Sequence, residues 1–233
     1  MIFDFNLVAK YYDEYYHSEF GRKVDAVEKR LVKKYIEQIP IKNALEVGCG
    51  TGHWTEFFIN NGFEITGIDI SENMINIARK KNLKDAKFEI INIEDAPYPD
   101  NSFDNIFAIT SLEFVDNRQK AIEQIYRILK PGGYLLIGCL NQNSFIGKTK
   151  QSNKVFARAN FFDTEQLQEI LNIFGSTVIE GCALITDNKG SIEPSENISE
   201  NEPNQVLDYD DDISRDVLRK NGAFLVGFVK KEL

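Results

Sequence analysis

Ala44-Leu-Glu-Val-Gly-Cys-Gly-Thr-Gly52 is the stretch of the chain that decides the fold. Its first four residues predict a short buried strand, and three alternate glycines follow that strand directly. Glycine permits a tight turn there, and it lets backbone N–H groups approach a ligand without obstruction from a Cβ atom. The stretch therefore predicts a ligand site at the carboxyl end of a strand in an α/β sheet.

Segments of strand and helix character alternate on both sides of this stretch. Further strands are predicted at residues 63–68, 87–91, 105–110, 134–140, 177–184 and 223–229. Amphipathic helices are predicted at residues 20–39, from Trp54 onward, after an N-cap at Ser71, at residues 121–129, and after an N-cap at Asp163 or Thr164. This alternation is typical of an α/β protein with a mostly parallel sheet covered on both faces.

The domain organisation predicted from this pattern is one unit over residues 1–233. Residues 1–40 are expected to form a helical cap, residues 41–140 the ligand-binding core, and residues 141–233 a C-terminal half. Within that half, residues 187–212 contain nine acidic residues and one basic residue. Such a composition predicts a solvated insertion, because it buries little apolar surface to offset the entropy of ordering.

Composition limits the class of protein. Hydrophobic residues make up 42% and charged residues 27% of the 233 residues, which is the globular range. There is no apolar run of the length that spans a bilayer, and residues 1–7 lack the layout of a signal peptide. The three cysteines are too scattered to suggest a disulfide framework or a metal site. These features predict a cytoplasmic protein with no metal and no membrane partner.

The next polar residue of interest is Asp69, which ends the second predicted strand. A carboxylate there can accept hydrogen bonds from both hydroxyls of a ribose. A dinucleotide fingerprint would place a third glycine where this chain has His53, and Glu46 stands where a dehydrogenase strand is apolar. A carboxylate at Glu46 can organise the loop or meet an ammonium group. An adenosine that carries a methionine fits these residues better than a dinucleotide does.

Four motifs in this order resemble those of class I S-adenosylmethionine-dependent methyltransferases. The first is the glycine stretch at residues 44–52. The others are Thr66-Gly-Ile-Asp-Ile-Ser-Glu-Asn-Met74, Pro97-Tyr-Pro-Asp-Asn-Ser-Phe-Asp104 and Leu129-Lys-Pro-Gly-Gly133. The resemblance is to the branch that includes ubiquinone and menaquinone methyltransferases. It implies a Rossmann-like, doubly wound sheet of seven strands, mostly parallel with one antiparallel strand near an edge, and an N-terminal helical cap.

The resemblance also implies S-adenosyl-L-methionine as cofactor and a set of residues that bind it. These residues are Glu46, Gly48, Cys49, Gly50, Gly52, His53, Asp69, Ile70, Met74, Asn92, Ile93, Glu94, Thr110 and Ser111. Asn92 departs from the family, which usually has an aspartate there to accept a hydrogen bond from the adenine amino group. An amide oxygen can accept the same bond more weakly.

Candidates for contact with the methyl acceptor lie in two places. Tyr11, Tyr15 and Tyr16, with Tyr12 beside them, are expected to form an aromatic lid over the substrate; simple helix packing is the alternative. Glu113 follows the fourth strand of the core and is a candidate catalytic or substrate-binding residue. The alternative for Glu113 is a carboxylate that stabilises the start of a helix.

The function predicted is methyl transfer to a small-molecule acceptor by a monomer or homodimer, with no nucleic-acid partner. A nucleic-acid methyltransferase of the same fold is one alternative, although Thr110-Ser-Leu-Glu113 stands where such enzymes carry an N/D-P-P-Y/F-type motif. A regulatory protein that binds the cofactor without turnover is the other alternative. The sequence motifs identify the cofactor far better than the acceptor, because the reaction needs alignment more than any particular side chain.

Overall fold

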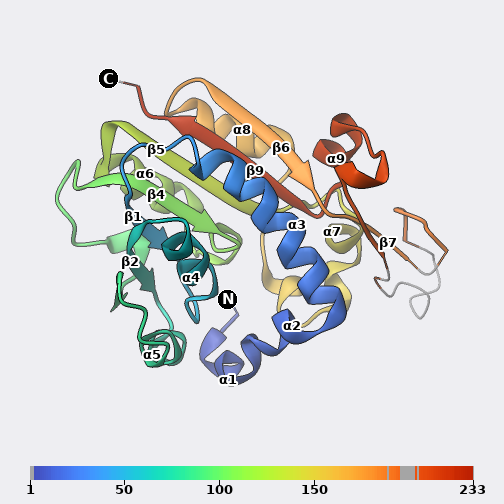
Figure 1. Cartoon of the computed structure of the whole chain (residues 1–233), viewed down its shortest axis with the longest axis horizontal. Coiled ribbons are helices and arrows are strands. Elements are labelled where there is room, and N and C mark those ends of the chain that lie inside the picture. Colours follow the sequence, from blue (N-terminus) through green and yellow to red (C-terminus); the bar gives the residue numbers. More distant parts are fainter. Residues whose placement is uncertain (1–2, 188, 195–202, 204, 233) are drawn as a thin grey trace.

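A seven-stranded sheet forms the centre of the computed structural model, which describes residues 3–187, 189–194, 203 and 205–232 (Figure 1). In spatial order the strands are β3, β2, β1, β4, β5, β9 and β6. Their bounds are β1 Asn43–Val47, β2 Glu64–Asp69, β3 Ala86–Ile90, β4 Phe103–Ile109, β5 Leu129–Leu140, β6 Thr177–Cys182 and β9 Phe224–Lys230. Only β9 runs antiparallel to its neighbours, β5 and β6. The predicted fold class is confirmed.

Helices cover the two faces of this sheet. One face is covered by α3 (Glu19–Ile36) and α4 (His53–Asn60), which lie in front of the sheet in Figure 1. The other face is covered by α6 (Arg118–Ile128) and α8 (Thr164–Asn172). The strands between them alternate their side chains between two apolar cores, because successive residues of a strand point to opposite faces. In β9, Phe224 and Val226 enter the first core and Leu225 the second.

Local capping explains where several helices begin. The Ser71 hydroxyl accepts a hydrogen bond from the Met74 N–H and caps α5 (Glu72–Lys80). The Asp163 carboxylate caps α8 in the same way. The helix α6 ends at Ile128 before residues 131–133, as predicted, but β5 already begins at Leu129 rather than at residue 134. Leu129 pairs with Phe103, so the strand continues through the glycines.

The chain before the sheet consists of short helices. After a 3-10 turn at Phe5–Leu7 come α1 (Ala9–Tyr12) and α2 (Glu14–His17), and then the long helix α3. The start of α3 is capped by Ser18, whose hydroxyl accepts a hydrogen bond from the Gly21 N–H. The 3-10 turn at Phe5–Leu7 and the helix α1 both contact α5, which follows β2. The N-terminal segment therefore reaches the edge of the sheet where β2 ends (Figure 1).

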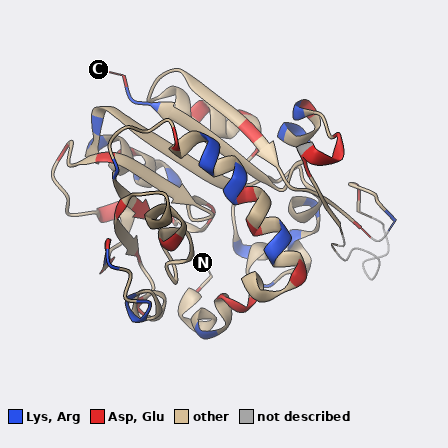
Figure 2. Cartoon of the chain, viewed as in Figure 1, with Lys and Arg blue, Asp and Glu red and all other residues tan. Residues whose placement is uncertain are grey.

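Part of the acidic stretch is packed against the remainder of the protein rather than solvated. β8 (Gln205–Leu207) pairs with β7 (Leu184–Thr186) in a small second sheet. Asp208 is 4% exposed, and its carboxylate accepts a hydrogen bond from Arg30 of α3, where basic and acidic residues are interspersed (Figure 2). Residues 188, 195–202 and 204 lie outside the described residues. The remaining helices are α7 (Phe145–Thr149) and α9 (Arg215–Asn221).

Candidate cofactor and acceptor site

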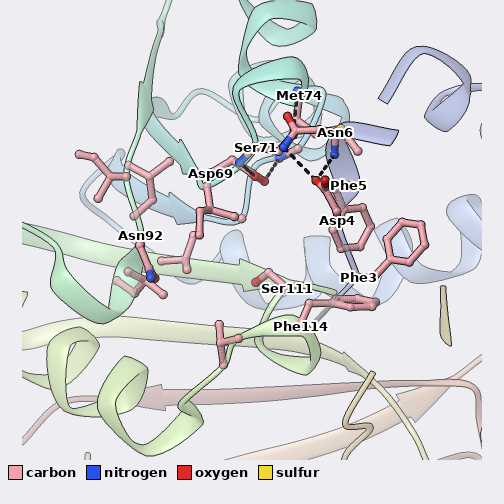
Figure 3. Close-up of a pocket in the computed structure, with 18 of the residues that line it drawn as sticks. Phe3, Asp4, Phe5, Asn6, Asp69, Ser71, Met74, Asn92, Ser111 and Phe114 are labelled. Atoms are coloured by element: carbon pink, nitrogen blue, oxygen red, sulfur yellow. Dashed lines mark hydrogen bonds between the residues drawn. The ribbon is translucent and has the colours of Figure 1, made fainter. Parts of the chain in front are cut away.

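A cavity of about 280 Å³ lies at the carboxyl ends of β1, β2 and β4 (Figure 3). Ten of the fourteen residues predicted to bind the cofactor line it. They are Gly48, Gly50, Asp69, Ile70, Met74, Asn92, Ile93, Glu94, Thr110 and Ser111. Three more, Glu46, Cys49 and His53, line a second cavity of about 20 Å³. Gly48, Gly50, Thr110 and Tyr12 line both cavities, so the two are neighbours.

The glycine loop has a backbone that other residues rarely adopt. Gly48, Gly50 and Gly52 have φ angles of 71°, 53° and 80°. A Cβ atom on Gly48 would lie 2.3 Å from the Cβ of Ser111, which is too close for two carbon atoms. The approach of the loop to the end of β4 therefore requires glycine at position 48. Gly52 lines neither cavity. A Cβ there would meet Phe88 at 3.3 Å, which indicates a packing role against β3.

Asp69 holds this loop in place. One of its carboxylate oxygens accepts a hydrogen bond from the Gly50 N–H at 2.9 Å, and the other accepts one from the Ser71 N–H at 2.8 Å. Burial raises the pKa of Asp69, although these backbone donors act in the opposite direction. Each carboxylate oxygen has two lone pairs, so both oxygens can accept one further hydrogen bond from a ligand.

Glu46 lies beneath the second cavity and is 2% exposed. The Thr55 hydroxyl donates a hydrogen bond to its carboxylate at 2.5 Å. Burial raises the pKa of Glu46 to about 8, against the opposing effect of that hydrogen bond. A buried carboxylate with one hydrogen-bond donor is suited to receive a cationic group from a ligand.

Asn92 lines the large cavity where the chain leaves β3. Its side-chain oxygen accepts a hydrogen bond from the Glu94 N–H at 3.0 Å and caps the short helix Ile93–Asp95. The Glu94 carboxylate in turn accepts a hydrogen bond from the Asn117 N–H at 2.9 Å. These bonds fix this part of the cavity wall. They also leave the amide NH₂ of Asn92 as the group free to donate to a ligand.

The N-terminal segment contributes a wall that sequence motifs did not indicate. Phe3, Asp4, Phe5 and Asn6 all line the large cavity, and Figure 3 shows them across it from Asn92. The ring of Phe5 lies edge-on to that of Phe114 with their centroids 4.9 Å apart. No sequence pattern marks these four residues as ligand-binding, because the segment carries no motif of its own.

The predicted tyrosine lid is only partly at the cavities. Tyr12 and Tyr16 line the second cavity, whereas Tyr11 and Tyr15 line neither and are 54% and 47% exposed. The ring of Tyr16 stacks on His53 with centroids 3.5 Å apart. His17, at the end of α2, is exposed and lines neither cavity.

His53 belongs to a polar cluster with α3. Its Nε2 lies 2.7 Å from a carboxylate oxygen of Asp25 and 2.8 Å from the Lys29 ammonium group. Burial would raise the pKa of Asp25, but its hydrogen bonds to His53 and Lys29 outweigh burial and lower it. This cluster joins α3 to the start of α4. It positions His53 and Tyr16 along one edge of the second cavity.

The structure does not bring Glu113 to either cavity. Its side chain is 1% exposed, and one carboxylate oxygen accepts a hydrogen bond from the Leu140 N–H at 2.7 Å. The other oxygen, Oε2, is buried with no hydrogen-bond partner among the residues the structure describes. Burial raises the pKa of Glu113 to about 7.

Another buried carboxylate, Glu28, was not identified from the sequence. It lies on α3 and is 8% exposed. Burial raises its pKa to about 8, and the negative charges of Asp25 and Glu113 act in the same direction. The sequence did contain a signal, because Glu28 lies at helical spacing between Val24 and Leu31 on the apolar face of α3. A charge in such a stripe indicates a special role for that position.

No group of three or more potential metal-binding side chains occurs in the described part of the chain. None of the helices found there is long and apolar enough to cross a bilayer.

Comparison with known proteins gives consistent matches. A methyltransferase domain family matches residues 45–137. An uncharacterised protein of Methanocaldococcus jannaschii is 34% identical over 184 residues, which are 77% of this chain and 85% of that protein. The demethylmenaquinone methyltransferase of Tropheryma whipplei is 36% identical over 57% of this chain and 56% of its own. The match thus spans just over half of that enzyme's length.

A solved structure matches nearly the whole chain. It is a methyltransferase of Thermotoga maritima described as dependent on S-adenosylmethionine and as a possible histamine N-methyltransferase. It is 27% identical, covers 98% of both chains and has a TM-score of 0.69. The similarity includes the N-terminal segment and the C-terminal half as well as the sheet.

Proposed function

This chain belongs to the class I S-adenosylmethionine-dependent methyltransferases, and from that premise we propose that it methylates a small-molecule acceptor. The observation that carries the proposal is the pair of adjoining cavities, one beside Asp69 and one above Glu46. Together they offer polar groups for a ribose and for an amino acid at two ends of one site. Relatives with named acceptors, such as the demethylmenaquinone methyltransferase, act on small molecules.

The residues present fit the cofactor. The absence of a Cβ on Gly48 leaves backbone exposed at the point where the two cavities meet. Asp69 would accept hydrogen bonds from the ribose hydroxyls, and Glu46 would face the ammonium group of the methionine moiety. Met74 and Ile93 would pack on the adenine. The Ser111 hydroxyl, which is buried without a partner in the described structure, is available for a further polar contact.

S-adenosylmethionine supplies a methyl group bonded to a positively charged sulfur, which is a good leaving group. The protein therefore has to align the acceptor and exclude water. The N-terminal segment serves the second task, because Phe3 and Phe5 form an apolar wall of the large cavity (Figure 3). Tyr12 and Tyr16 line the second cavity, where they would limit the size of the acceptor.

A nucleic-acid acceptor is less well supported by the charges. Phosphate binding requires basic side chains that are not already paired. On α3, Lys23, Lys29 and Lys34 form ion pairs with Glu19, Asp25 and Glu180, respectively. Charges of both signs are interspersed along this helix in Figure 2. A small acceptor that enters beside the tyrosines fits this surface better than a nucleic acid does.

The test is methyl transfer from S-adenosylmethionine labelled on the methyl group. The purified protein is incubated with fractions of small metabolites, RNA and protein, and the label is followed in each. We expect label in the small-metabolite fraction, and we expect it to be lost with Asp69→Ala. Label confined to RNA or protein would contradict the proposal. Cofactor binding without transfer to any fraction would favour a regulatory protein instead.

A further inference from the structure

We propose that Glu94 and Asn92 together recognise the adenine of the cofactor, with Glu94 as the acceptor for its 6-amino group and Asn92 as the donor to its N1 atom. The inference rests on the proposed function and concerns the base end of the same site. Both residues line the large cavity where the chain leaves β3, and Figure 3 shows Asn92 there. The fold uses one polar group of each side chain and leaves the other for a ligand.

One hydrogen bond fixes the orientation of the Asn92 amide. The Glu94 N–H donates to the side-chain oxygen of Asn92 at 3.0 Å, which caps the short helix Ile93–Asp95. An amide NH₂ group cannot accept such a bond, so the nitrogen takes the other position. A flipped amide would set two donors against each other and remove the cap. The group that Asn92 offers beyond this bond is therefore a donor.

The NH₂ group of Asn92 is free for a ligand. Among the described residues, the bond from Glu94 is the only hydrogen bond of the Asn92 side chain. The Asn92 nitrogen is not among the buried side-chain atoms that lack a partner there, so it is accessible. Because Asn92 lines the large cavity, a ligand in that cavity can reach this donor.

Glu94 offers the opposite kind of group on the same wall. One of its carboxylate oxygens accepts a hydrogen bond from the Asn117 N–H at 2.9 Å, which holds the side chain beside the start of α6. Its other oxygen accepts no hydrogen bond from the described residues, and that oxygen is also accessible. Glu94 is only 8% exposed, and a carboxylate with so little solvent requires further donors. A donor from a ligand in the cavity would complete its hydrogen bonding.

The pairing of β2 with β3 places these two groups at the base end of the site. Asp69 at the end of β2 lies opposite Ile90 at the end of β3, and adjacent strands are about 4.8 Å apart. Asn92 therefore stands two residues beyond the position opposite Asp69. A nucleoside whose ribose is bound by Asp69 extends its base over this end of β3, where the apolar side chains of Ile93 and Met74 line the cavity. The edge of the base then meets the two polar groups.

Adenine carries the matching pair of groups on one edge. Its 6-amino group donates and its neighbouring N1 atom accepts, so the first pairs with Glu94 and the second with Asn92. A 6-oxopurine has the reverse pair, an acceptor at O6 and a donor at N1–H. Its O6 would face the carboxylate and its N1–H would face the NH₂ group, which leaves both side chains without a partner. The two residues thus select adenine over 6-oxopurine rings.

Binding of S-adenosylhomocysteine and of its 6-oxo counterpart, S-inosylhomocysteine, tests this assignment by isothermal titration calorimetry. The wild type should bind the adenine compound about 10-fold or more tightly. Asn92→Asp replaces the donor by an acceptor and keeps an oxygen for the Glu94 N–H. It should weaken the binding of S-adenosylhomocysteine by about 10-fold and reduce the preference for adenine. If the Asn92 oxygen accepted from the amino group instead, the charged aspartate would bind S-adenosylhomocysteine more tightly.

Glu94→Gln replaces the free acceptor by a donor and keeps an oxygen for the Asn117 N–H. It should also reduce the preference for adenine, and the double variant Asn92→Asp/Glu94→Gln should prefer S-inosylhomocysteine. Asn143→Asp is the matched control, because it makes the same substitution at an exposed residue that lines neither cavity. Its affinities for the two compounds should equal those of the wild type.

Tighter binding of S-adenosylhomocysteine by Asn92→Asp, or an unchanged preference for adenine in Glu94→Gln, would overturn the assignment. Equal affinity of the wild type for the two compounds would overturn it as well. These outcomes leave the proposed function intact, because S-adenosylhomocysteine still binds. If the wild type binds neither compound, the proposed function fails together with the assignment.

Discussion

The side-chain oxygen of Asn6 accepts a hydrogen bond from the Ser71 hydroxyl at 2.8 Å, which joins the N-terminal segment to the loop after β2 (Figure 3). The same oxygen accepts a second bond from the Asn73 N–H at 3.0 Å. Because Ser71 also caps α5, the segment is attached to a fixed point of the fold. The wall formed by Phe3 and Phe5 is thereby positioned over the cavity that contains Asp69.

Replacement of Asn6 by alanine tests the importance of this attachment. We expect Asn6→Ala to weaken S-adenosylhomocysteine binding by about 1–2 kcal/mol, because two hydrogen bonds that order the cavity wall are lost. The measurement is isothermal titration calorimetry. Asn221→Ala, at the end of α9 and away from both cavities, serves as the matched control. Equal affinities of the two variants would show that the wall does not depend on Asn6.

The close approach of the loop to β4 leads to a second prediction. Gly48→Ala should abolish measurable cofactor binding, because its Cβ would lie 2.3 Å from that of Ser111 and the loop must shift. Gly62→Ala separates this effect from backbone strain, since Gly62 also has a positive φ, 86°, but no atom within 4 Å of an added Cβ. It should cost about 1–2 kcal/mol of stability and leave binding intact. Similar binding by both variants would contradict the steric argument.

The buried Glu28 predicts an unusual dependence of stability on pH. Its pKa is about 8 in the folded protein and near 4.5 when the chain is unfolded, so the folded state holds one more proton between these values. The free energy of unfolding therefore decreases, through the titration of Glu28, as the pH rises from about 4.5 through about 8. Glu28→Gln removes this decrease, because glutamine does not ionise. It should be on the order of 2–4 kcal/mol more stable than the wild type at pH 8.5 and similar to it at pH 5.

Urea denaturation at the two pH values provides the measurement for Glu28. Glu37→Gln is the control, because that side chain is exposed at the end of the same helix. The prediction fails if the free energy of unfolding changes with pH in the same way for the wild type and for Glu28→Gln. Glu28 would then be solvated or paired in solution. Stabilisation of Glu28→Gln at pH 8.5 alone would show that the buried carboxylate lowers the stability of the wild type.

Arg30 gives a prediction about the acidic stretch. It binds the carboxylates of both Asp208 and Asp210, whose side chains are 5% and 79% exposed. Asp208→Ala should lower the free energy of unfolding by about 1–3 kcal/mol, because the carboxylate that Arg30 binds is itself buried, although Arg30 is half-exposed. Asp210→Ala should change it by less than about 0.5 kcal/mol. The free energy of unfolding is measured by urea denaturation. If Asp208→Ala and Asp210→Ala lowered it equally, residues 205–211 would not be packed as described.

Sequence patterns predicted the sheet well because the central strands are short, mostly buried segments, and turn or capping residues follow them. The order of motifs also fixed the family and the antiparallel strand. The packing of Asp208 could not be predicted in the same way, because it depends on Arg30, 178 residues away along the chain. Composition alone made that stretch look solvated throughout.

The cofactor side of the site was largely predictable, and the acceptor side was not. The glycines of residues 48–52 and Asp69 occupy positions that are set by local backbone geometry. A sequence motif can therefore identify them. The segment Phe3–Asn6 reaches the large cavity only through tertiary packing, so no local pattern indicated it. Glu113 was singled out from its position after β4, but its side chain turns to the Leu140 N–H instead of the cofactor cavity.

The central claim is that the cavity beside Asp69 binds S-adenosylmethionine, and calorimetric titration of the purified protein tests it most directly. S-adenosylmethionine should bind more tightly than NAD. Asp69→Ala should weaken that binding by about 1–3 kcal/mol, because hydrogen bonds from the ribose to a charged acceptor are lost. Tighter binding of NAD than of S-adenosylmethionine, or full affinity in Asp69→Ala, would contradict the account.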